Sequence, residues 1–520
     1  IKALFQYEIV LSFFLLCLGN IYMSEKLSTA VTQDESVTDT SEFDNVLYFI
    51  KENEQIIDPD STIDGAKIVR KLDLIILPLL CCIYFLQFLD KSLLNYAAAM
   101  GIKKVLDNHG VGNNQFANLS TMFYASYIFG EPIMSYILQR YPLGKSLGVC
   151  IVLWGVVVTC HSACSSYASL MIVRTLLGIF ESSSAVGLIT ISGMYYNKRQ
   201  QVARMGIWSV MAGTATIFGG LLSFAFQHIH VQKFKSWQIL FLVIGLITIA
   251  FGFFVMVYLP DNIDTVWFLN KQEKLYILNH TVRPNQTGTK SSKFKWKHIK
   301  ELLILDKFTW LYFLLTICSQ IVTGAIGTFS VTITLSFGFD SYQSALLQLP
   351  IGALIIIIIL TATQLVSQCG HITYIIISMY IPTIVGAIVL IISPNKIGNI
   401  MALYLLYSGS SVITLIYSWT SVHTAGTSKK IFRSGMIMIA FSIACIIGPQ
   451  LFQNYSAPKY HPAKIVILIT QCMCIPITWL IGWMCQQENS KRDQIKDQMP
   501  ENFEFFDLTD LENTQFRYSY

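Results

Sequence analysis

Apolar runs long enough to cross a lipid bilayer recur along most of this chain. A membrane-spanning helix needs about 20 mostly apolar residues, and from residue 72 onward the sequence supplies such runs one after another. Six lie in the first half, near residues 74–99, 118–138, 146–163, 170–195, 204–226 and 237–259. Six more lie near residues 310–335, 344–367, 372–392, 400–419, 434–451 and 465–484. The sequence therefore predicts an all-α membrane protein with twelve transmembrane helices in two six-helix bundles.

The composition excludes an ordinary soluble enzyme. Charged residues make up 13% and hydrophobic residues 53% of the 520 residues, whereas about 25% of residues are charged in a typical soluble domain. The twelve cysteines lie mostly in apolar runs without paired spacing, and the net charge of +5 is too small for a nucleic-acid surface. The sequence contains neither a Walker loop nor an HExxH motif. We therefore expect no enzymatic activity, cofactor, metal site or nucleic-acid partner.

The polar segments divide the chain into six parts. The stretch before Met23 is apolar but lacks a start methionine, and the stretch after it is rich in Ser, Thr, Asp and Glu without an apolar period. We expect upstream translation or a non-native leader at 1–22, a disordered cytosolic tail at 23–70, bundles at 71–260 and 308–486, a cytosolic linker at 261–307 and a cytosolic C-terminal tail at 487–520.

Positive charges in the short loops predict the orientation in the membrane, because cytosolic loops carry an excess of Lys and Arg. The charges that fall on the same side as the lysine-rich central linker are Arg140, Lys145, Lys198, Arg199, Lys429, Lys430 and Arg433. This side is expected to be the cytosol, and both termini lie on it.

Ionisable groups at membrane depth mark candidate functional positions, because each costs about 2.5 to 3.5 kcal/mol unless it faces a cavity or a partner. In the first helix, Tyr84, Gln87, Lys91 and Asn95 recur at helical spacing and form one polar stripe, with Asp90 beside it.

The fourth helix carries Arg174 and Glu181 seven residues apart. This spacing is about two helical turns, so both side chains point the same way at a separation of about 10 Å. Two interpretations stay open for Arg174 with Glu181, and for Asp90 with Lys91: neutral pairs that hold helices together, or groups that face a cavity.

Uncharged polar stripes occupy the equivalent helices of the second half. They consist of Tyr312, Thr316, Gln320, Thr323 and Gly327 in the seventh helix, and of Tyr404, Tyr407, Ser411, Thr414 and Ser418 in the tenth. Such stripes can bond neighbouring helices. A cavity wall is favoured here, because charge concentrates in helices one and four and hydroxyls in the equivalent helices seven and ten.

Several longer segments carry a family resemblance. They are FLDKSLLNYAAAMG from Phe88, EPIMSYILQRYPLGK from Glu131, RTLLGIFE from Arg174 and the tail FFDLTDLENTQFRYSY. With these segments the chain, from about Leu72 onward, resembles the major facilitator superfamily and, within it, the fungal allantoate permease branch of the anion:cation symporter family. The resemblance implies two bundles rocking around a midplane site. It also implies proton-driven uptake of a small organic anion by a multi-pass monomer in the plasma membrane.

The polar stripes and the resemblance together give three sets of candidate residues. The candidates for substrate binding are Arg174, Lys91, Gln87, Asn95, Gln320, Tyr407 and Ser411. Those for proton coupling are Glu181 and Asp90, and those for gating are Glu131, Arg140, Lys145 and Arg204. Arg174 is the first choice for the anion because a guanidinium binds a carboxylate bidentately. Substrate that engages Arg174 would weaken its hold on Glu181 and favour protonation of that carboxylate.

Five residues depart from the usual pattern of the branch. His423 stands where Asn is usual, Ala444 and Cys445 replace a Gly-Asn pair, Val186 replaces a proline and Gln200 replaces an acidic residue. We expect these changes to leave the fold intact and to affect substrate identity. Branch members carry allantoate, vitamin acids, amino-acid-like anions and dipeptides.

Two other functions stay open. A nutrient sensor would keep the fold and bind without transport, and the departures at His423 and Cys445 are its only support. A drug:proton antiporter is disfavoured, because its usual loop signature with an Asp appears here as Gln139, Arg140, Gly144 and Lys145.

The orientation can be tested with a peptide tag inserted near Gly288, in the lysine-rich linker. If the linker is cytosolic, the tag should be inaccessible to membrane-impermeant reagents in intact cells and accessible after permeabilisation. Labelling in intact cells would overturn the orientation.

Overall fold

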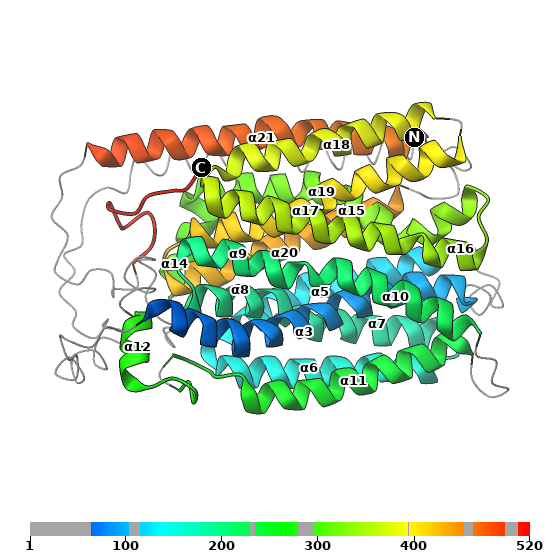
Figure 1. Cartoon of the computed structure of the whole chain (residues 1–520), viewed down its shortest axis with the longest axis horizontal. Coiled ribbons are helices and arrows are strands. Elements are labelled where there is room, and N and C mark those ends of the chain that lie inside the picture. Colours follow the sequence, from blue (N-terminus) through cyan, green and yellow to red (C-terminus); the bar gives the residue numbers. More distant parts are fainter. Residues whose placement is uncertain are drawn as a thin grey trace.

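The computed structural model describes residues 64–102, 115–228, 235–263, 265–278, 295–393, 395–451, 461–494 and 508–520. These residues form helices joined by turns, without any strand. The long helices run side by side along the longest axis of the molecule, with the first half of the chain below the second half (Figure 1). The expected leader at 1–22 and most of the expected tail at 23–70 lie outside the described residues.

The first half consists of helices from α3 to α11. Their bounds are α3 (Gly65–Ala99), α5 (Gln115–Arg140), α6 (Leu143–Cys160), α7 (Tyr167–Glu181), α8 (Ser183–Tyr195), α9 (Lys198–Ser209), α10 (Met211–Gln227) and α11 (Ser236–Tyr258). A capping box begins α9, in which the Asn197 side chain accepts from the Gln200 N–H at 2.9 Å. Gln200 returns the contact through its side chain, so this departure from the branch preserves the helix cap.

The second half consists of helices from α15 to α21. Their bounds are α15 (Lys307–Ser336), α16 (Ser341–Leu346), α17 (Gln348–Cys369), α18 (Ile372–Ile392), α19 (Lys396–Val422), α20 (Thr427–Gln450) and α21 (His461–Asp493). Between the halves lie α12 (Lys271–Ile277), α14 (Trp296–Lys300) and a π-helical turn at Glu301–Leu305. The Asp306 side chain caps α15 by accepting from the N–H groups of Phe308 and Thr309.

Eleven helical segments of the described ranges are long and apolar enough to cross a membrane. They include the continuous segments Tyr167–Tyr195 and Gln200–Gln227. Helix α5, with 26 residues, has the length of a twelfth span. The expected all-helical fold with twelve spans in two groups of six is confirmed.

The two ends of the molecule differ in what they carry. We call the end with α12, α14 and residues 508–520 the linker end, and the end with α16 the opposite end (Figure 1, left and right). At the linker end, Lys71 of α3 pairs with Glu273 of α12 at 2.5 Å. This is the end that the loop charges predict to be cytosolic.

Glycines let the two halves approach closely. A Cβ atom added at Gly213 of α10 would lie 2.5 Å from the carbonyl oxygen of Gly352 in α17, and the reciprocal distance is also 2.5 Å. A Cβ at Gly220 would lie 3.0 Å from the carbonyl oxygen of Ala345. Side chains at these positions would therefore push α10 away from α16 and α17, as expected for small residues at membrane-helix contacts.

A buried charge cluster joins the C-terminal residues 508–520, here called the C-terminal strap, to the second half. Lys429 Nζ lies 2.7 Å from Glu301, 3.1 Å from Asp306 and 2.8 Å from Asp510. Arg433 pairs with Asp306. Burial opposes ionisation of Asp510, but the adjacent Lys429 and Arg433 outweigh it and hold the pKa of this carboxyl below its ordinary value.

Hydrogen bonds to backbone carbonyls also hold the strap. Trp419 Nε1 donates to the carbonyl oxygen of Ser519 at 3.0 Å, and Arg492 donates to two further strap carbonyls. The ring of His423 contacts the same Ser519 carbonyl through Nε2 and lies 2.7 Å from the Tyr312 hydroxyl through Nδ1. The histidine that departs from the family pattern therefore takes part in docking the strap.

Replacement of Lys429 tests the importance of this cluster. Lys429→Met would leave three buried carboxylates without their shared cation, so we expect a loss of about 3 to 5 kcal/mol in the free energy of unfolding. The matched control is Lys67→Met, because the Lys67 side chain is 81% exposed and its ion pair should contribute little. Thermal unfolding in detergent compares the variants. Equal melting temperatures for Lys429→Met and the control would contradict the expectation.

Candidate functional site

The two halves of the chain enclose a cavity of about 140 Å³. Helices α3, α5, α7 and α10 of the first half and α15, α17, α19 and α20 of the second contribute to its walls. All seven residues proposed for substrate binding from the sequence line it: Arg174, Lys91, Gln87, Asn95, Gln320, Tyr407 and Ser411.

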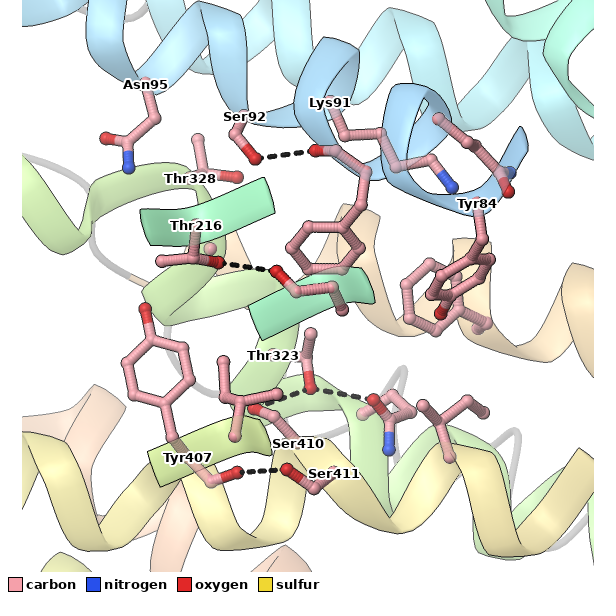
Figure 2. A pocket seen from close by; sticks show the side chains of 18 of the residues that line it. Tyr84, Lys91, Ser92, Asn95, Thr216, Thr323, Thr328, Tyr407, Ser410 and Ser411 are labelled. Carbon is pink, nitrogen blue, oxygen red and sulfur yellow. Dashed lines mark hydrogen bonds between the residues drawn. The ribbon is translucent and has the colours of Figure 1, made fainter. Parts of the chain in front are cut away.

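One wall is the polar stripe of α3. Tyr84, Gln87, Lys91 and Asn95 all line the cavity, because residues three and four apart share one face of a helix. Figure 2 shows Tyr84, Lys91 and Asn95 projecting from α3. Asn95 reaches across to the second half, where its Nδ2 donates to Ser330 Oγ at 2.9 Å.

The facing wall comes from α15 and α19 and is uncharged. Thr323 donates to Gln320 Oε1 at 2.7 Å and lies 3.0 Å from Ser410 Oγ. Tyr407 and Ser411 lie on the same helix as Ser410, across the cavity from α3 (Figure 2). This wall therefore offers hydroxyl and amide groups to a bound molecule, and the opposite wall offers charge.

The charged partner of Glu181 is Lys91. Lys91 Nζ lies 3.3 Å from Glu181 Oε1, and the two side chains are 15% and 0% exposed. The ammonium also lies 5.4 Å from the ring centroid of Tyr127 and 5.8 Å from that of Phe441. Helices α3 and α7 are thus joined by an ion pair at the edge of the cavity.

Arg174 lines the cavity without an ion pair among the described residues. Its guanidinium carbon lies 5.9 Å from the ring centroid of Phe241, and the residue is 2% exposed. Neither Nε nor Nη2 has a hydrogen-bond partner in the described part of the chain. Two N–H-bearing nitrogens of a buried cation therefore lack the hydrogen bonds that buried polar groups normally make.

Asp90 points away from Lys91 in spite of their adjacency in sequence. Its Oδ2 accepts from Trp154 Nε1 of α6 at 2.6 Å, inside the first half. Within the described residues, neither Asp90 with Lys91 nor Arg174 with Glu181 forms the ion pair that the sequence left open. The role of Trp154 was missed because it lies in an apolar run that gives no sign of a polar contact.

Hydrogen bonds between the two halves join them at the linker end. Gln139 of α5 donates to Ser428 Oγ of α20 at 2.6 Å, and Gln201 of α9 donates to Ser421 Oγ of α19 at 2.6 Å. We call these two contacts the linker-end gate. Both involve neutral side chains, so the gate can break without exposing an unpaired charge.

The four residues proposed for gating lie in different surroundings. Glu131 is buried where α5 faces α20. Arg140 and Lys145 are exposed at the end of α5 and the start of α6, and Arg204 pairs with Asp73 within the first half at 2.8 Å. Of the four, Glu131 is the one that the structure brings to the contact between the halves.

Among the described residues, no cluster of three or more His, Cys, Asp or Glu side chains could hold a metal ion. Gly324 of α15 packs against the backbone of two of the departures from the branch, Ala444 and Cys445. A Cβ at Gly324 of α15 would lie 2.6 Å from Cys445 Cα and 2.9 Å from the Ala444 carbonyl oxygen. The absence of a side chain at Gly324 therefore permits the close approach of α15 and α20.

Comparisons with known proteins agree on one family. The sequence profile of the Major Facilitator Superfamily matches residues 80–449. The chain is 58% identical over 459 residues to the Thiamine pathway transporter THI73 of Saccharomyces cerevisiae, with 88% of this chain and 87% of that protein covered. It is 31% identical over 476 residues to the Allantoate permease of the same organism, with 88% and 87% covered.

A solved structure extends the likeness to the fold. The proton:xylose symporter XylE aligns with a TM-score of 0.62 at 11% identity, over 78% of this chain and 95% of that chain. At so low an identity the likeness concerns the architecture alone.

A double-mutant cycle tests the ion pair between Lys91 of α3 and Glu181 of α7. Lys91→Met and Glu181→Gln should each destabilise the protein, because each removes one partner of a buried pair. The double variant should be more stable than the sum of the single losses predicts, with a coupling free energy of about 1 to 3 kcal/mol. The control cycle uses Lys67 and Asp64, an exposed pair at 3.6 Å whose coupling should be near zero. Equal coupling in both cycles would argue against the Lys91–Glu181 pair.

Proposed function

The chain belongs to the Major Facilitator Superfamily and is a multi-pass membrane transporter, and from this premise we propose that it takes up a small organic anion together with protons. The plasma membrane is the proposed location and alternating access the proposed mechanism, in which the two bundles expose a midplane site to each side in turn. The observation that carries the proposal is the Arg174 guanidinium, which lines the cavity with two nitrogens that have no partner among the described residues.

Counting charges around the cavity supports an anionic substrate. Lys91 and Arg174 contribute two positive charges, and Asp90 and Glu181 contribute two negative charges when ionised. A monoanion added to this neutral set would leave one uncompensated buried charge, which is costly. One proton taken up by Glu181 restores neutrality. The set therefore accepts a monoanion and a proton together more readily than either alone.

The Lys91–Glu181 pair supplies the coupling in this proposal. Protonation of Glu181 removes the charge that holds Lys91, so the ammonium can turn to the carboxylate of the substrate. Arg174 provides a permanent charge, because a guanidinium is always protonated in proteins. Lys91, rather than Arg174, is thus the group for which the carboxylates of Glu181 and the substrate compete, and this changes the assignment expected from sequence spacing.

The energetics follow from this stoichiometry. One proton moved with one monoanion transfers no net charge, so the driving force is the pH gradient, worth about 1.4 kcal/mol per pH unit. The membrane potential, worth about 2.3 kcal/mol per charge per 100 mV, contributes only if more than one proton accompanies the anion. Uptake should therefore respond strongly to external pH and weakly to a potassium diffusion potential.

The substrate can be sought by uptake in a transporter-deficient yeast that expresses residues 23–520. Radiolabelled allantoate and thiamine are suitable first probes, because the relatives carry these names, together with vitamin acids, amino acids and dipeptides. Thiamine is a cation, so thiamine uptake without uptake of any anion would overturn the anion proposal. Binding without uptake would favour a sensor, and acid-driven efflux would favour an antiporter.

Two variants separate the fixed charge from the titratable one. Arg174→Ala should abolish binding and transport of the anion, and Arg174→Lys should restore them only in part because it lacks the bidentate geometry. Glu181→Gln mimics the protonated carboxyl, so it should retain binding and counterflow exchange while losing accumulation driven by a pH gradient. Lys67→Ala, on the exposed start of α3, serves as the control for expression and transport.

Surface abundance is measured first, because a variant lost from the membrane reports on stability alone. An abundant Glu181→Gln protein that still concentrates the anion with a normal pH response would refute the coupling role of Glu181. An abundant Arg174→Ala protein with normal affinity would refute the anion site.

A further inference from the structure

Glu131 is a buried carboxyl at the contact between the two halves of the chain. It lies on α5 with 0% exposure, and a Cβ added at Gly435 of α20 would lie 3.5 Å from its Cγ and its Oε1. It does not line the cavity. Its side chain is therefore enclosed between α5 and α20, on the path between the cavity and the linker end.

Among the buried acidic residues of the described ranges, Glu131 differs in having neither a hydrogen bond nor an ion pair. Asp90 accepts from Trp154, Glu181 pairs with Lys91, and the other three belong to the cluster around Lys429. An ionised carboxylate without such partners is strongly unfavourable in an apolar environment, and the group instead takes a proton. Glu131 thus fits its surroundings as a neutral acid.

The groups around Glu131 do not supply a dedicated counter-charge. Electrostatic contact comes from Lys91 of α3, Tyr127 of α5 and Tyr417 of α19. Lys91 is already paired with Glu181. The neighbouring helices carry four further positive charges. Arg174 of α7 interacts with Glu181 and Asp90. Lys429 and Arg433 of α20 belong to the buried charge cluster that docks the strap, and Lys430 of α20 lies against Gly193 of α8.

One face of α5 connects Glu131 to the linker-end gate. Ser135 and Gln139 follow at intervals of four residues and therefore lie one and two turns further along the same face. Ser135 Oγ lies 3.0 Å from the position of a Cβ at Gly435, and Gln139 makes the gate contact with Ser428 at 2.6 Å. Separation of α5 from α20 at the gate would therefore bring water to Glu131.

We propose that Glu131 is a second proton-binding group of the transport cycle, which binds a proton as the linker-end gate closes and releases it to the solution as the gate opens. Lys91 is shared between two carboxyls in this scheme: it pairs with Glu181 while Glu131 is neutral, and it can turn to Glu131 once Glu131 is ionised. The place of this proton in transport rests on the proposed function, whereas the linkage of protonation to gate closure does not.

The linkage has a definite sign. Closure creates a site with higher affinity for the proton than the hydrated open state, so low pH favours the closed gate and high pH the open gate. For one linked proton the ratio of closed to open forms changes by up to about tenfold per pH unit. In Glu131→Gln, which resembles the neutral acid, the gate should stay closed irrespective of pH.

The gate can be followed without a substrate by labelling Ser135→Cys. Ser135 is 1% exposed and its hydroxyl has no hydrogen-bond partner among the described residues, so the change removes no hydrogen bond. A membrane-impermeant maleimide is added to the linker side of membrane vesicles, and peptide mass spectrometry quantifies the label at position 135 over a range of pH. Maleimide reacts with the thiolate, so the rate at each pH is divided by the rate for the same cysteine in unfolded protein. We expect this normalised labelling to rise with pH in Ser135→Cys and to be low and pH-independent when Glu131→Gln is added.

Gln139→Ala is the matched control on the same face of α5, because it weakens the gate without removing a titratable group. It should raise labelling at every pH and preserve the pH dependence. A normal pH dependence in the Glu131→Gln background would overturn the proposal. Loss of the pH dependence in the Gln139→Ala background would likewise overturn the assignment to Glu131.

Infrared spectroscopy provides an independent readout of protonation. The wild-type protein at neutral pH should show the C=O stretching band of a protonated carboxylic acid, and part of this band should be absent in Glu131→Gln. An unchanged band would overturn the proposal. If Glu131→Gln fails to accumulate, reaction of the wild type with dicyclohexylcarbodiimide decides: modification of Glu131 supports the proposal, and modification confined to other carboxyls overturns it.

These measurements use no transported substrate, so their outcome is separable from that of the proposed function. Transport without a pH response alongside a pH-dependent gate would refute proton coupling and leave the linkage at Glu131 intact. Proton-coupled transport alongside a pH-independent gate would refute the role of Glu131 alone.

Discussion

The ion pair between Lys91 and Glu181 is the interaction on which the site depends. A fully buried carboxylate needs a cation or a proton, and here the available cation also lines the cavity. Whatever removes the charge of Glu181 therefore makes Lys91 available, and whatever engages Lys91 favours protonation of Glu181. In the proposed mechanism, proton and anion are linked in this way without any movement of the helices that carry the two residues.

The contacts between the two halves are suited to repeated opening. The linker-end gate consists of amide and hydroxyl groups, and Gly213 and Gly352 let α10 and α17 touch through their backbones. Neither kind of contact leaves an unpaired charge when it breaks. Charge is concentrated instead within each half, in the Lys91–Glu181 pair of the first and in the Lys429 cluster of the second. Each half is thereby held together while the surface between them stays weakly bonded.

The sequence predicted the parts of this arrangement that depend on periodicity. The lengths of the apolar runs predicted the spans, and the spacing of Tyr84, Gln87, Lys91 and Asn95 predicted one face of α3. The stripes of α15 and α19 were predicted in part: the residues that line the cavity are Gln320, Thr323, Gly327, Tyr407, Ser411 and Thr414, whereas Tyr312, Thr316, Tyr404 and Ser418 do not line it. In all these cases the residues lie on one helix, so helical geometry alone decides which side chains lie together.

The pairing between helices could not be predicted in the same way. Asp90 and Lys91 are adjacent in sequence, yet one hydrogen-bonds to Trp154 of α6 and the other pairs with Glu181 of α7. The isolation of Glu131 and the docking of the strap onto His423 are also tertiary features. They depend on the rotation and depth of each helix relative to its neighbours, which packing determines and the pattern of a single helix does not encode.

The most direct test of the central claim is the number of protons taken up when the transported anion binds. Calorimetric titration of purified protein in buffers with different ionisation enthalpies gives this number without any membrane gradient. If Glu181 exchanges Lys91 for a proton, the wild type should take up close to one proton per anion when titrated at a pH where Glu181 is ionised before binding. Glu181→Gln should bind the anion without taking up a proton at position 181. Anion binding to the wild type without proton uptake, or equal uptake in both proteins, would contradict the account.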